Sequence, residues 1–103
     1  MSDQIETIEP EQLKALIANE DQPVIIDVRE NEEVASGMIS GAIHIRLGDL
    51  PERYHELDPA QEYVMVCRSG RRSEKAAEFL QGKGFKVKNM DGGMLKWNGD
   101  IWA

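Results

Sequence analysis

The segment VMVCRSGRRSEKAAEFL, residues 64–80, contains the features that decide the fold. Its first residues belong to an apolar run, 62–67, that is typical of a buried strand, and residues 73–83 place apolar side chains on or near one helical face. Cys67, the only cysteine of the chain, therefore lies where a strand ends and a helix begins. Three arginines stand close to it, although the chain has a formal net charge of −7.

Short apolar runs and short helical patterns alternate along the rest of the chain, which predicts an α/β fold with a parallel sheet. We expect further strands within 5–10, 23–30, 42–45 and 85–90. We expect further helices from Glu9-Pro10 to Asn19, around 31–35, after Asp49 with Pro51 in the first turn, and after a tight turn at Gly92-Gly93. Gly84 is placed to end the helix over 73–83 in a left-handed conformation.

Length and composition are those of one small globular domain. A chain of 103 residues with 41% hydrophobic and 30% charged residues can bury a core of its own, and a second domain is not expected. We therefore treat residues 1–103 as a single domain.

The balance of charge excludes several classes of partner. With 12 basic and 19 acidic residues, the chain repels phosphate backbones and anionic membrane surfaces, so nucleic acid is not expected as a partner.

The N-terminus lacks the basic and apolar regions of a signal peptide, and no apolar run approaches the length of a membrane span. A lone cysteine forms neither an internal disulfide nor a multi-cysteine metal site, so we expect a reducing, cytoplasmic location and no bound metal.

Asp27, Arg29 and Cys67 stand at the C-terminal ends of predicted strands, where open α/β sheets form their ligand sites. Ser69 and Gly70 allow the loop after Cys67 to turn several backbone N–H groups inward, and the start of the next helix adds partial positive charge. Both features favour an anion at the loop centre. If the Cys67 sulfur lies there, its pKa falls below the free value of about 8.5 and the thiolate becomes a reactive nucleophile.

Arg68, Arg71 and Arg72 carry fork-shaped donors that suit oxyanions. We hypothesise that they lower the pKa of Cys67 and bind an anionic substrate. Two alternatives are a solvated basic patch and a buried cysteine that serves as a small apolar residue. Against the first, arginine at a helix N-terminus opposes the helix dipole, at a cost of about 0.3–1 kcal/mol per position.

Protein tyrosine phosphatases also use a cysteine loop, with five residues between cysteine and arginine and usually a histidine before the cysteine. Here Val66 precedes Cys67, and Arg72 follows after only four residues. The smaller ring is one residue too short for phosphate, which argues against a phosphatase or an arsenate reductase of related fold.

Four segments resemble, in order and spacing, the motifs of the single-domain rhodaneses, or thiosulfate sulfurtransferases: IIDVRE (25–30), SGMISGAIHI (36–45), VMVCRSGRRS (64–73) and NMDGGMLKW (89–97). The resemblance covers nearly the whole chain, and the six-residue loop that begins at Cys67 is its most specific part. It implies a rhodanese-like three-layer fold, with a five-stranded mainly parallel sheet flanked by helices, and no cofactor. One departure is Met38, where the family often has histidine.

The resemblance also implies a ping-pong reaction. The Cys67 thiolate would take the outer sulfur of thiosulfate or a related donor, and the persulfide would pass it to cyanide, a thiol or a protein acceptor. Asp27 and Arg29 would orient loops, although a structural ion pair explains them equally well. A persulfide carrier with little turnover on small molecules is the alternative function. The substrate-binding residues would be Arg68, Ser69, Gly70, Arg71 and Arg72.

Several other residues are interpreted as structural. Nothing in the sequence places His44 or His55 beside the cysteine, so a cysteine-histidine pair is not expected. We expect Met94 and Trp97 to pack into the core, and Trp102 either to be exposed or to pack back onto the domain.

Overall fold

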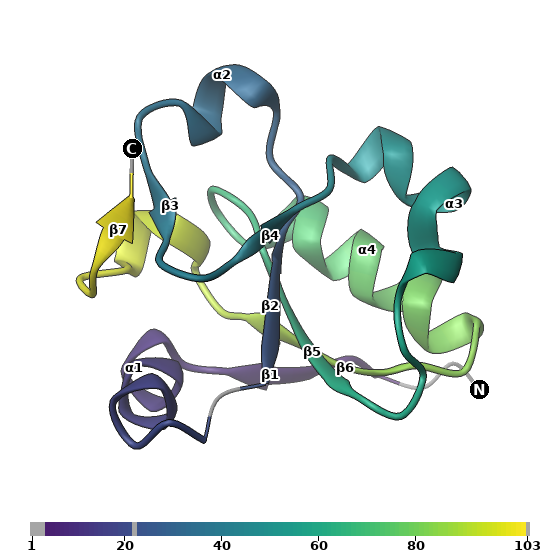
Figure 1. The fold of residues 1–103 in the computed structure, drawn as a ribbon, viewed down its shortest axis with the longest axis horizontal. Helices are drawn as coiled ribbons and strands as arrows, with labels where there is room; N and C mark the ends of the chain where they lie inside the picture. The colour runs from purple at the N-terminus through teal and green to yellow at the C-terminus, as the bar shows by residue number, and fades with distance from the viewer. Residues whose placement is uncertain (1–3, 22, 103) are drawn as a thin grey trace.

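The computed structural model describes residues 4–21 and 23–102. Five strands form one sheet in the order β1-β6-β5-β2-β4, and every neighbouring pair is parallel (Figure 1). This arrangement confirms the predicted α/β fold with a five-stranded parallel sheet, and it places β5 at the centre. The strands are β1 (Glu6–Ile8), β2 (Val24–Asp27), β4 (Ile43–His44), β5 (Glu62–Val66) and β6 (Lys86–Met90).

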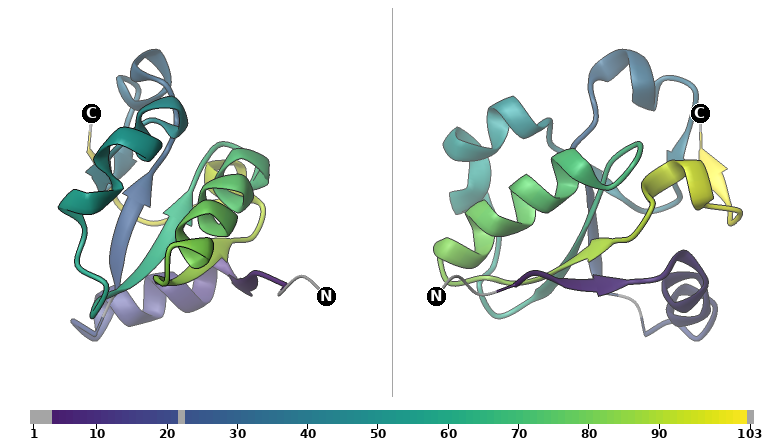
Figure 2. Two further views of the ribbon diagram at one scale, coloured as in Figure 1. Left: turned by 90° about the vertical axis from the view of Figure 1, so that its right-hand side faces the viewer. Right: turned by 180° about the vertical axis from the view of Figure 1, so that it is seen from behind.

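Helices cover both faces of the sheet. They are α1 (Pro10–Ala18), α2 (Asn31–Val34), α3 (Leu50–Arg53) and α4 (Arg71–Gly82), with the short 3-10 helices η1 (Leu47–Asp49), η2 (Tyr54–Glu56) and η3 (Gly93–Lys96). As Figures 1 and 2 show, α1 lies on one face and α3 and α4 lie on the other. None of the helices in the described residues is long and apolar enough to cross a membrane.

The two faces of the central strands pack into two separate apolar clusters. On β2, Ile26 belongs to the cluster beside α3 and α4, while its neighbour Ile25 belongs to the cluster beside α1. On β5, Met65 and Val64 divide in the same way. Because side chains alternate between the faces of a strand, strands covered on both faces need the continuous apolar runs present in this sequence.

Helix α4 packs its apolar face on the sheet. Ala76, Ala77 and Leu80 are fully buried, and all three belong to the cluster on that face. Gly84 follows the helix with φ +94°, the left-handed conformation predicted for it. The helix therefore ends where the sequence predicted.

Two helix starts differ from their predicted form. Helix α4 begins at Arg71, earlier than the predicted start at Ser73, because Gly70 at the N-cap turns the chain directly from the loop into the helix. Asp49 occupies the N-cap position of α3, but its carboxylate pairs with Arg46 at 2.8 Å and makes no side-chain cap.

The structure also contains a two-stranded antiparallel sheet that the sequence did not predict. Its strands are β3 (Met38–Ile39) and β7 (Ile101–Trp102). Met38–Ile39 lies in the glycine-flanked segment SGMISG, which is typical of a turn, and its partner strand lies far along the chain, so no local pattern indicates this pairing. Trp102 is 67% exposed in this sheet, whereas Met94 and Trp97 pack against the core as predicted.

Candidate active site

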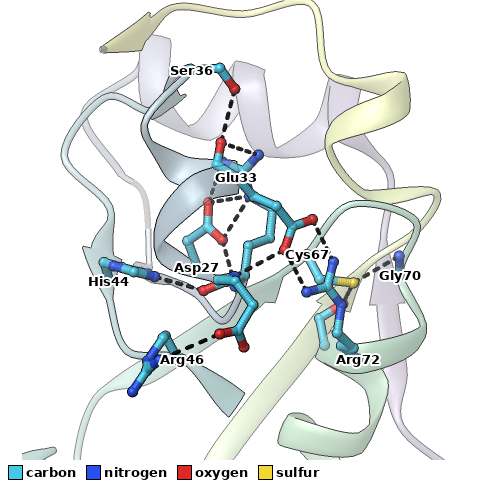
Figure 3. Close-up of polar contacts among 11 residues, drawn as sticks. Asp27, Glu33, Ser36, His44, Arg46, Cys67, Gly70 and Arg72 are labelled. Carbon is cyan, nitrogen blue, oxygen red and sulfur yellow. Dashed lines mark hydrogen bonds and ion pairs between the residues drawn. The ribbon is translucent and has the colours of Figure 1, made fainter. Parts of the chain in front are cut away.

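The Cys67 side chain lies just beyond the C-terminal end of the central strand β5, where α4 begins (Figure 3). The residue is fully buried. The loop turns back over the sulfur, so that the Gly70 N–H donates to Sγ at 3.0 Å and the Ser73 hydroxyl lies 3.2 Å from Sγ. Gly70 reaches this position with φ 102°, which residues with a side chain rarely adopt. A small apolar core residue needs none of these donors, so the geometry favours an anionic sulfur.

Burial and hydrogen bonding act in opposite directions on the pKa of Cys67. Burial is the largest single effect, and it raises the pKa. The Ser73 hydroxyl and the backbone N–H groups of Ser73, Gly70 and Ser69 lower the pKa, and together they bring it below its usual value. The lowered pKa agrees with the prediction, and the loop N–H groups were among its predicted causes. The Ser73 hydroxyl is a further cause that was not predicted, and the arginines, also expected to lower the pKa, are not among the largest causes.

The turn after β6 supports the outer side of the cysteine loop. The Met94 N–H donates to the Cys67 carbonyl at 2.8 Å, and the Leu95 N–H donates to the Arg68 carbonyl at 3.0 Å. Because these carbonyls form hydrogen bonds on the outer side of the loop, the N–H groups of the loop can point toward the sulfur. A Cβ at Gly93 would lie 2.5 Å from the backbone of both loop residues. Gly93 thus permits a close approach of two backbone segments, beyond the tight turn predicted for the glycine pair.

Asn89 connects the neighbouring strand β6 to the same loop. It pairs with Met65 of β5 in the sheet register. Its Nδ2 donates to the Gly70 carbonyl at 2.9 Å, and its Oδ1 lies 2.5 Å from the Ser73 hydroxyl. Because Asn89 is only 6% exposed, this bridge between sheet and loop is shielded from water.

The three loop arginines lie in different environments. Arg68 and Arg71 are exposed, whereas Arg72 is half-buried. The two terminal nitrogens of Arg72 contact the carboxylate of Glu33 on α2 at 2.6 and 2.7 Å (Figure 3). This hydrogen bonding lowers the pKa of Glu33 to about 2, so the pair stays ionised at neutral pH. Arg72 therefore lies beside the cysteine in a fixed orientation, while the other two arginines face solvent.

Asp27 and Arg29 form a buried ion pair at the end of β2. The Arg29 side chain donates to both carboxylate oxygens of Asp27 at 2.8–3.0 Å. It also donates to the carbonyls of Gly37 at 2.8 Å and Glu33 at 3.4 Å, and His44 Nε2 lies 2.7 Å from the Arg29 carbonyl. These contacts join β2, α2 and the turn before β3, which favours the loop-orienting role.

Three residues at the site are absent from the predicted set: Glu33, Ser73 and Asn89. A serine at a helix start is ordinarily read as part of a helix signal, so Ser73 was not assigned to the site. The available signal for Asn89 was its place on the apolar side of an alternating strand, after Phe85 and Val87, and the structure shows all three to be buried. Glu33 lies 39 residues from Arg72, and no local pattern connects them.

Known proteins share the sequence and the fold of this chain. The family model described as "Rhodanese-like domain" matches residues 9–100. The protein YtwF of Bacillus subtilis is 47% identical over 97 residues, which cover 94% of each chain. The thiosulfate sulfurtransferase GlpE of Pseudomonas entomophila is 35% identical over 91 residues, which cover 87% of this chain and 82% of that relative.

Among solved structures, a rhodanese-like domain protein from Staphylococcus aureus superimposes with a TM-score of 0.88 at 31% identity. The superposition covers 93% of this chain and 94% of the other. The similarity therefore extends over most of both chains rather than over the loop alone.

We predict that Arg29→Met lowers the free energy of unfolding by about 3–5 kcal/mol, because it leaves the Asp27 carboxylate buried without its partner. Arg53→Met is the matched control, since the Arg53–Glu56 pair lies at the surface and its loss should change stability little. Chemical denaturation measures both effects. Equally small effects would contradict a structural role for the buried pair.

We predict that Gly93→Ala raises the pKa of Cys67 and slows its alkylation at neutral pH, because the added Cβ would push on the loop backbone and displace the amides that face the sulfur. Gly82→Ala is the matched control, because its Cβ meets no atom within 4 Å and it lies in a helix. The rate of reaction with iodoacetamide against pH measures the pKa. An unchanged profile in Gly93→Ala would show that this backbone contact does not set the loop geometry.

Proposed function

Because the chain belongs to the rhodanese-like domain family, we propose that it is a sulfurtransferase that takes the outer sulfur of thiosulfate and carries it as a persulfide of Cys67. The observation that carries this proposal is the hydrogen-bonded sulfur of Cys67, with its lowered pKa, at the end of β5. The thiolate is the form of cysteine that attacks another sulfur. The name of the relative GlpE supports thiosulfate as the donor.

The reaction has two half-reactions. In the first, the Cys67 thiolate attacks the outer sulfur of thiosulfate, a new bond to Sγ forms, and sulfite leaves with the electron pair of the broken S–S bond. In the second, cyanide or a thiolate attacks the outer sulfur of the persulfide, and Cys67 leaves as the thiolate. With an anionic acceptor the cycle needs no proton and no external electron, so one cysteine is sufficient.

The loop supplies the groups that bind the charges of these anions. Backbone amides stabilise the charge near sulfur, and arginine forks suit the oxygens of thiosulfate and sulfite. Glu33 holds the Arg72 guanidinium in place beside the loop. Asp27 and Arg29 act indirectly in this proposal, by orienting α2 and the turn before β3. The substrate-binding residues are Arg68, Ser69, Gly70, Arg71 and Arg72.

The burial of Cys67 restricts the donor. The loop must open locally before an outer sulfur can reach Sγ, and this requirement favours small anionic donors over bulky ones. Cyanide, a low-mass thiol or a thiol of another protein is the proposed acceptor. Small-molecule turnover and sulfur delivery to a protein differ only in this second half-reaction.

The test is thiocyanate formation from thiosulfate and cyanide by the purified protein. We predict turnover that is lost in Cys67→Ala, with the fold retained by circular dichroism, because the variant has no nucleophile. Absence of turnover in folded wild-type protein would contradict the thiosulfate assignment. Ready persulfidation by a protein donor in that case would favour the carrier function.

Arg72→Ala should lower kcat/KM for thiosulfate by about tenfold or more, because hydrogen bonds to charged groups contribute roughly 1.5–3 kcal/mol and 1.4 kcal/mol corresponds to a factor of ten. Arg53→Ala, an exposed arginine in another ion pair, is the matched control and should leave kcat/KM unchanged. Steady-state kinetics with varied thiosulfate measures both variants. Equal kcat/KM in wild type and Arg72→Ala would remove Arg72 from donor binding.

A further inference from the structure

The Ser73 hydroxyl has two acceptors within reach but only one hydrogen to donate. Its oxygen lies 3.2 Å from Sγ of Cys67 and 2.5 Å from Oδ1 of Asn89. Ser73 is fully buried and Asn89 nearly so. Solvent therefore does not readily supply a second donor, and the hydroxyl satisfies one acceptor at the expense of the other.

The orientation of the Asn89 amide follows from its other contact. Nδ2 donates to the Gly70 carbonyl at 2.9 Å, and a carbonyl oxygen can only accept. The acceptor oxygen Oδ1 must then face Ser73. Because Gly70 also donates its N–H to Sγ, the Asn89 side chain contacts two of the residues that hydrogen-bond the sulfur, Gly70 and Ser73.

The charge on Sγ changes during the proposed reaction, on which this part of the inference rests. The free thiolate carries a full charge at Sγ and attracts the Ser73 hydrogen. In the persulfide the charge moves to the outer sulfur, and in the neutral thiol it is absent, so Sγ no longer needs that donor. Asn89 Oδ1 is the one other acceptor of Ser73 among the hydrogen bonds of the described residues.

We propose that Asn89 is a positioning residue that accepts the Ser73 hydrogen whenever Sγ is uncharged and gives it up when Sγ becomes a thiolate. The Ser73 hydrogen is thereby bonded both when the sulfur is a thiolate and when it is a persulfide, the two forms that alternate in the cycle. Asn89 competes with the thiolate for the same hydrogen, so it moderates the stabilisation that Ser73 gives to the anion. By the same free energy, Asn89 favours the form of the protein that carries the persulfide over the form with the free thiolate.

The charged groups near the sulfur belong to other elements, and among the described residues none of them forms a hydrogen bond with Asn89. Arg72 of α4 interacts with the charge of Cys67, and Glu33 of α2 binds that arginine, with Glu30 close enough to act on it as well. Substitution of Asn89 leaves these three groups in place. Changes in Cys67 reactivity that depend on both Asn89 and Ser73 therefore report on the shared hydrogen.

The test is a double-mutant cycle that uses Asn89→Leu, Ser73→Ala and the double variant in the whole chain. The pH dependence of iodoacetamide alkylation gives the pKa of Cys67 without any sulfur donor. We expect Asn89→Leu to lower the pKa of Cys67 more when Ser73 is present than in the Ser73→Ala background. At a pH below the pKa, this difference should give roughly 2- to 10-fold more thiolate, as expected for one hydrogen bond. A purely structural role would shift the pKa equally in both backgrounds.

An equal shift in the two backgrounds, or a larger downward shift without Ser73, would overturn the proposal. If Asn89→Leu does not fold, Asn89→Ala removes the same oxygen without added volume and enters the same cycle. Transfer of sulfur from the persulfide to cyanide in a single turnover tests whether Asn89 stabilises the persulfide form. We expect this transfer to be faster in Asn89→Leu than in wild type. Failure of persulfide loading in wild type would count against the proposed function, whereas the alkylation cycle would still decide the role of Asn89.

Discussion

A cysteine sulfur buried at the end of a central strand carries negative charge only if the protein itself stabilises that charge, and much of the site follows from this constraint. Cys67 has no solvent-exposed surface in the structure, and its hydrogen-bond donors are the loop amides and Ser73. The amides face the sulfur because Gly70 has a positive φ and because the backbone of η3 holds the loop carbonyls from the other side. The parallel sheet supplies the setting, since β5 ends where α4 begins.

Ion pairs fix the elements around this loop and leave part of its positive charge free. The buried Asp27–Arg29 pair joins the end of β2 to the turn before β3, and Glu33 on α2 binds Arg72. The exposed arginines at positions 68 and 71 then form a local positive region on a chain of net charge −7. In the proposed function this region attracts the small anionic donor.

Sequence analysis identified what depends on local patterns and missed what depends on contacts between distant segments. The apolar run before Cys67 and the helical pattern after it located the loop, and Gly84 marked the end of α4. The β3–β7 sheet was missed because it pairs two segments that lie far apart in the sequence, and no local pattern connects them. Asn89 faces the cysteine loop through the register of β5 and β6, which only the assembled sheet defines. The loop N–H groups were correctly expected to lower the pKa of Cys67, whereas the arginines, expected to do the same, are not among the largest causes.

The most direct test of this account is intact-protein mass spectrometry after incubation with thiosulfate and removal of small molecules. The account predicts a mass increase of one sulfur atom that maps to Cys67, disappears after addition of cyanide, and does not form in Cys67→Ala. Folded protein that gains no sulfur, or that gains it in Cys67→Ala as well, would contradict the claim that this buried thiolate carries the transferred atom.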